Sequence, residues 1–178
     1  MNTTITSHLQ QLDEHLKWSF EQARSLSTEQ FHQQPSPDSW SMCQVLEHIL
    51  QSETGTLGYM MKKSSSGWEA LEDEGAEQKQ NGVALSTRLQ SNEKYKAPAI
   101  LPEPTNTTSL ESFESNWPKL RTQLSAFVQS VDPQFHNKLV FKQPLAGMLT
   151  LPSTTAFLSS HFKHHMPQIE SILLNVRP

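Results

Sequence analysis

Apolar residues recur at intervals of three and four in four separate stretches of the chain. The first stretch runs from Thr3 to Leu26, and its stripe consists of Ile5, Leu9, Leu12, Leu16 and Phe20. This spacing matches the period of an α-helix that buries one face. It predicts a first helix over these residues.

A second stripe follows a segment, 27–38, in which Pro35 and Pro37 interrupt the helical pattern. We expect a connecting loop there. Ser41 and Gln44 then have the spacing of a capping box, which marks the start of a helix. The stripe beyond them predicts a second helix that ends near Met61.

The sequence changes character between residues 62 and 108. It contains serines, a run of acidic residues and three closely spaced prolines. A stretch of this length without a sustained stripe is unusual inside a compact domain and is typical of a functional lid or a partly mobile connection. We interpret it as a long crossover, with one short helix over about 83–94.

The third helix is predicted to follow the crossover. Thr108 and Glu111 have the spacing of a second capping box, and an apolar stripe then continues to Val131. Pro118 lies within this stripe, so we expect it to bend the helix or to mark its true beginning.

The last part of the chain predicts an extended excursion and then a fourth helix. Segment 136–150 has no convincing strand partner, and Pro152 suits the first turn of a helix that continues to the C-terminus. Pro167 should kink this helix, because its ring clashes with the carbonyl of Lys163. Four helices of bundle length predict an all-α four-helix bundle.

Composition narrows the class of protein. The chain has 178 residues, a net charge of -4 and a pI near 6.0, so residues 1–178 are expected to form one domain with no nucleic-acid partner. We expect no membrane segment and a cytoplasmic location, because no long apolar run and no export signal is evident. Cys43, the one cysteine, is expected to pack in the core.

Three histidines form the main chemical signal. His161 and His165 are four residues apart in the predicted fourth helix and therefore share one face, while His48 lies in the second helix. If these helices pack together, three imidazoles can bind one metal ion and leave a position open for water or substrate. Alternatively, each is a hydrogen-bonded core histidine. His164 points about 100 degrees away, toward the rim.

Several stretches resemble the DinB-like (DinB/YfiT) superfamily in order and spacing over about residues 5–175. They are CQVLEHILQSE after Trp40 and Ser41, KYKAPAILPEP, and HFKHHMPQIESIL, which contains His161, His165 and Gln168. The resemblance implies an up-down-down-up four-helix bundle, often a homodimer. It also implies that His48, His161 and His165 hold a divalent metal ion, zinc or nickel.

The resemblance implies a metal-dependent transferase that uses a low-molecular-weight thiol, or a metal-dependent hydrolase, acting on a small-molecule substrate. Glu53 is the one candidate base near His48 along the helix, but it lies about 140 degrees around from it. The alternatives are a non-catalytic bundle that binds metal or only dimerises, and a metal-free small-molecule binding protein. No catalytic residue is assigned.

Overall fold

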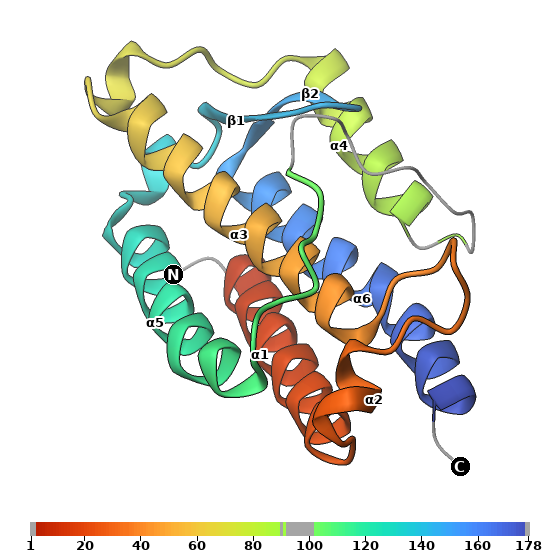
Figure 1. Ribbon diagram of the computed structural model, residues 1–178. Coiled ribbons are helices and arrows are strands. Elements are labelled where there is room, and N and C mark those ends of the chain that lie inside the picture. Colours follow the sequence, from red (N-terminus) through yellow and green to blue (C-terminus); the bar gives the residue numbers. More distant parts are fainter. Residues whose placement is uncertain (1–2, 90, 92–101, 177–178) are drawn as a thin grey trace.

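The computed structural model describes residues 3–89, 91 and 102–176 (Figure 1). Its long elements are four helices: α1 (Thr3–Arg24), α3 (Met42–Ser64), α5 (Leu110–Ser130) and α6 (Leu151–Val176). Shorter elements connect them: α2 (Thr28–His32), α4 (Ala76–Leu89), the 3-10 turns η1 (Trp68–Ala70) and η2 (Pro133–Phe135), and strands β1 (Leu139–Gln143) and β2 (Gly147–Thr150). The expected helical bundle is confirmed, with a small sheet added.

The long helices have the up-down-down-up order that the resemblance implies. Helices α1 and α6 run in one direction, and α3 and α5 run in the opposite direction (Figure 1). Because α3 and α5 are parallel, the chain between them must return along the length of the bundle. Helix α4 lies in this long crossover and packs against α6 and β2.

The apolar stripe of α1 faces the core. Its buried members are Ile5, Leu12, Leu16 and Phe20. Helix α1 packs mainly against α6, and burial of each such side chain stabilises the fold by about 1.5–3 kcal/mol. The largest aromatic side chains of the bundle centre are also fully buried: Trp117, Phe113 and Phe162.

Segment 27–38 is not the simple loop that its prolines predict. Ser27 and Gln30 form a capping box, and the short helix α2 follows it. A helix of five residues is too short to show a periodic stripe, so the sequence pattern missed it. Its Phe31 is buried and contacts the Phe113 ring edge to face, at 6.3 Å between centroids.

Two other regions differ from the expected elements. Helix α4 begins at Ala76, seven residues before the predicted start, and the predicted helix beyond Ser91 lies outside the described residues. The excursion at 136–150 does contain paired strands, because β1 and β2 form an antiparallel hairpin. Gln143 closes its turn by accepting hydrogen bonds from two backbone N–H groups, and Gly147 adopts a positive φ of 76° that favours glycine.

The predicted capping boxes have different outcomes. Ser41 caps α3 with Gln44 as expected, whereas the N-cap of α5 is Ser109 and not Thr108. Thr108 donates its hydroxyl to a distant carboxylate, that of Glu47, and so does not cap the helix. Pro118 lies inside α5, which begins eight residues earlier, and therefore does not mark its start.

Helix α6 runs for 26 residues and continues through Pro167. The kink expected at that residue stays a prediction. Among the described helices, none combines the length and the apolar character that crossing a membrane would require.

Candidate metal centre

The structure brings His48, His161 and His165 together between α3 and α6. The Nε2 atom of His161 lies 3.2 Å from Nε2 of His48 and 3.3 Å from Nε2 of His165. One nitrogen from each ring fits within a span of 4.8 Å, so the group could hold a metal ion. His161 and His165 are one helical turn apart, and this spacing points both rings at the same place.

The hydrogen bonds around these rings favour a cation among them. Nδ1 of His165 lies 2.9 Å from Oε1 of Gln168, which can only accept a hydrogen bond. Nδ1 therefore carries the proton of the neutral ring, and Nε2 of His165 has a free lone pair. In a neutral His161 ring, Nε2 is either a hydrogen-bond donor or an acceptor. It therefore cannot form good hydrogen bonds to Nε2 of His48 and to Nε2 of His165 at the same time. A cation that accepts three lone pairs removes this conflict, so the donor set fits a metal ion.

The three rings are neutral in ordinary buffers. Burial lowers the pKa of His48 to about 4 and the pKa of His165 to about 3. Burial, and then the nearby His165 and His48, lower the pKa of His161 well below its usual value. Neutral imidazole is the form that binds metals, so near pH 7 no ligand has to lose a proton first.

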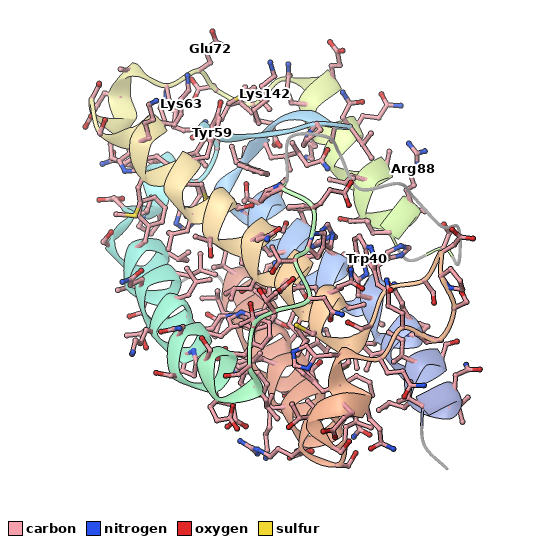
Figure 2. The ribbon with its side chains drawn as sticks, in the orientation of Figure 1. Trp40, Tyr59, Lys63, Glu72, Arg88 and Lys142 are labelled. Atoms are coloured by element: carbon pink, nitrogen blue, oxygen red, sulfur yellow. The ribbon has the colours of Figure 1, made fainter. Side chains whose placement is uncertain are left out.

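Aromatic rings flank the cluster on two sides. Trp40 lies against His48 at 5.1 Å between ring centroids, and Phe157 stacks on His161 at 5.5 Å. Trp40 precedes α3 and lies between α3 and α6 in the view of Figure 2. His48 is 3% exposed and His165 is 9% exposed, whereas His161 is the most open of the three.

His164 does not belong to the cluster. Its Nδ1 lies 3.0 Å from the backbone carbonyl of Leu89 at the end of α4. The ring is partly buried under α4, although the sequence placed it at the rim. It makes a structural contact that no local pattern could have predicted, since the two residues are 75 positions apart.

Glu53, the one candidate base, lies elsewhere in the structure. Its carboxylate accepts hydrogen bonds from Arg121 Nη2 and from Trp117 Nε1, both at 2.8 Å, and is 1% exposed. This buried ion pair joins α3 to α5. This position agrees with the angle of about 140 degrees that separates Glu53 from His48 around the helix, and the bound carboxylate is not available as a base at the three histidines.

Glu47, next to His48, also has a structural task that the sequence did not indicate. Its carboxylate accepts five hydrogen bonds from the segment Thr105–Thr108, three from backbone N–H groups and two from hydroxyls. Burial alone would raise the pKa of Glu47, but the hydrogen bonds from Thr108, Asn106 and Thr105 have the larger combined effect. They lower the pKa from its usual 4.5 to about 2. Glu47 thus fastens the end of the crossover to α3.

Replacement of Glu47 with glutamine is expected to lower the free energy of unfolding by about 2–3 kcal/mol, because an amide NH2 would face donors that are left unsatisfied. Urea unfolding measures the loss. Exposed Glu170→Gln is the control and should change stability by less than about 0.5 kcal/mol.

The stability difference between wild type and Glu47→Gln should also depend on pH. Since the folded pKa of Glu47 is depressed from 4.5 to about 2, this difference in free energy of unfolding should be complete above pH 4.5 and vanish toward pH 2. A loss that does not change with pH would contradict this assignment.

Cys43 is buried, as expected. Burial and the Glu47 carboxylate raise the pKa of its thiol to about 12. The thiol therefore stays protonated and packs in the core.

Comparison with known proteins gives two findings. A family model described as the DinB superfamily matches residues 11–169. An uncharacterized protein, YuaE of Bacillus subtilis (strain 168), is 25% identical over 154 residues, which cover 86% of this chain and 90% of that protein. No solved structure matches the chain significantly.

Proposed function

Because this chain belongs to the DinB superfamily, we propose that it is a metal-binding protein in which His48, His161 and His165 hold one divalent ion. The observation that carries the proposal is the convergence of three neutral Nε2 atoms, with His161 3.2 and 3.3 Å from its two neighbours. Imidazole nitrogens suit zinc and nickel, and we propose one of these. We further propose that residues 1–178 form a single domain.

Three protein ligands leave a coordination position for a reactant. A divalent ion in such a site lowers the pKa of a bound water or thiol, so that its deprotonated form becomes the nucleophile near neutral pH. The histidines would orient that group, and the rings of Trp40 and Phe157 would limit the access of bulk water to it.

Thiol transfer to a small electrophile is the reaction we propose. Hydrolysis benefits from a carboxylate base beside the attacking water, but the carboxylates closest to His48 along α3, Glu47 and Glu53, are bound to other residues. A thiol needs no such base, because once it has lost its proton to solvent the resulting thiolate is itself the nucleophile. Its sulfur forms a bond to the electrophilic carbon, and the leaving group departs with the electron pair of the bond that breaks.

Metal analysis combined with a transfer assay tests this proposal. Protein without a histidine tag should contain close to one equivalent of zinc or nickel, measured by mass spectrometry. It should speed the reaction of a small thiol with monobromobimane, which becomes fluorescent when the sulfur displaces bromide. Metal without transfer would favour the rival function, a non-catalytic metal-binding or dimerising bundle. Protein that binds no divalent metal would contradict both.

Removal of the metal is expected to leave the bundle folded. The core of α1, α5 and α6 is apolar and extensive, so folding does not depend on the ion as it does in small zinc domains. We expect EDTA to preserve helicity and cooperative unfolding, with a fall in Tm of about 5–10 °C. Circular dichroism measures both quantities. Loss of helicity on chelation would instead show that the protein needs the metal in order to fold.

A further inference from the structure

Two buried polar atoms on α3 lack a hydrogen-bond partner among the described residues, and they are chemically complementary. Nδ1 of His48 is one, and Oε1 of Gln51 is the other. When Nε2 of His48 binds a metal, Nδ1 must carry the proton of the neutral ring and becomes a donor. Gln51 Oε1 is an acceptor. A buried donor and a buried acceptor that both stay unpaired destabilise a protein, so each is expected to find a partner.

The spacing of these residues places them on the same face of α3. Gln51 follows His48 by three positions, and residues three apart are neighbours on a helix surface. The same arrangement exists in α6, where Gln168 follows His165 by three positions and its Oε1 lies 2.9 Å from Nδ1 of His165. Each of these two helices therefore carries a His-x-x-Gln pair that includes a proposed metal ligand, and in the pair on α6 the hydrogen bond is formed.

We infer that Gln51 is the positioning residue for His48, as Gln168 is for His165. Its Oε1 accepts the Nδ1 proton of His48, directly or through one bound water, and so fixes the tautomer that directs the Nε2 lone pair at the metal. Outer partners of this kind orient metal-binding histidines and raise their basicity. This inference rests on the proposed metal site. It assigns to Gln51 a role in metal affinity and none in contact with substrate.

The test compares Gln51→Leu, which removes the acceptor, with Gln51→Glu, which keeps one. Zinc affinity is measured by competition with a chromophoric chelator. We expect Gln51→Leu to bind zinc about 10- to 100-fold more weakly than wild type. Gln51→Glu should bind at least as tightly as wild type, since a carboxylate is the stronger acceptor. Exposed Gln80→Leu is the control for loss of a glutamine and should have wild-type affinity.

A spectroscopic measurement separates positioning from general damage. In zinc-loaded protein with labelled histidines, Gln51→Leu should shift the Nδ1–H signal of His48 and leave that of His165 in place. Gln168→Leu should do the reverse. Unchanged zinc affinity in Gln51→Leu, or an affinity loss without a change in the His48 signal, would overturn the role of Gln51. Failure of the wild-type protein to bind zinc would overturn the metal site as well, so the two failures are distinguishable.

Discussion

Replacement of His161 with alanine is expected to abolish divalent-metal binding, whereas His164→Ala retains wild-type affinity. His161 occupies the centre of the cluster, since its Nε2 is the atom in contact with both other Nε2 atoms. His164 is three residues further along α6 but bonds to the carbonyl of Leu89. The two variants therefore remove the same type of side chain from the same helix, and only one removes a proposed ligand.

The expected loss in His161→Ala is large because it removes a direct ligand. Loss of an outer hydrogen-bond partner alone weakens metal sites by about 10- to 100-fold, and loss of one of three ligands should exceed that range. Calorimetric titration with zinc measures it, and circular dichroism shows whether each variant is folded. Equal weakening in both variants would mean that the metal binds on another face of α6. Wild-type affinity in both would contradict the three-histidine site.

The proposed ligands were predictable because helical spacing and order along the chain carry the required information. His161 and His165 share a face in any regular helix, and capping at Ser41 fixed the start of the helix that carries His48. That α3 and α6 are neighbours followed from the resemblance to a known bundle and not from periodicity. The four long helices were predictable from periodicity, since each has an apolar stripe at helical spacing.

The remaining features depend on contacts between residues that are distant in sequence. The bonds from Thr105–Thr108 to Glu47 span 58 to 61 positions, and they also explain why Thr108 does not cap α5. The Glu53 carboxylate was considered as a base because sequence places it near His48, but Arg121 binds it from 68 positions away. Local sequence patterns predict which face of a helix a residue occupies, but they do not predict which distant residue its side chain will contact.

Removal of the Arg121 side chain is expected to destabilise the bundle by about 3–5 kcal/mol, the largest stability effect we predict. Arg121 is 8% exposed, and its loss in Arg121→Met leaves the Glu53 carboxylate buried with Trp117 Nε1 as its remaining donor. Asp13, 3.6 Å from Arg121, is 68% exposed, so Asp13→Asn should cost less than about 1 kcal/mol and serves as the control. Urea unfolding near pH 7 measures all three proteins.

The double variant Glu53→Gln with Arg121→Met tests whether uncompensated charge causes the loss. Glutamine keeps an acceptor for Trp117 and carries no charge, so we expect it to recover most of the stability that Arg121→Met loses.

The pH dependence of the stability loss is a second, independent test of the same cause. Burial already raises the pKa of Glu53, and Arg121 is the main group that lowers it. Without Arg121 the folded pKa rises further above the unfolded value, so stability is retained at low pH and lost as pH increases. The defect of Arg121→Met should therefore be smaller near pH 5 than near pH 7. A defect of equal size at both pH values, with no recovery in the double variant, would assign the loss to packing of the arginine side chain and not to the charge of Glu53.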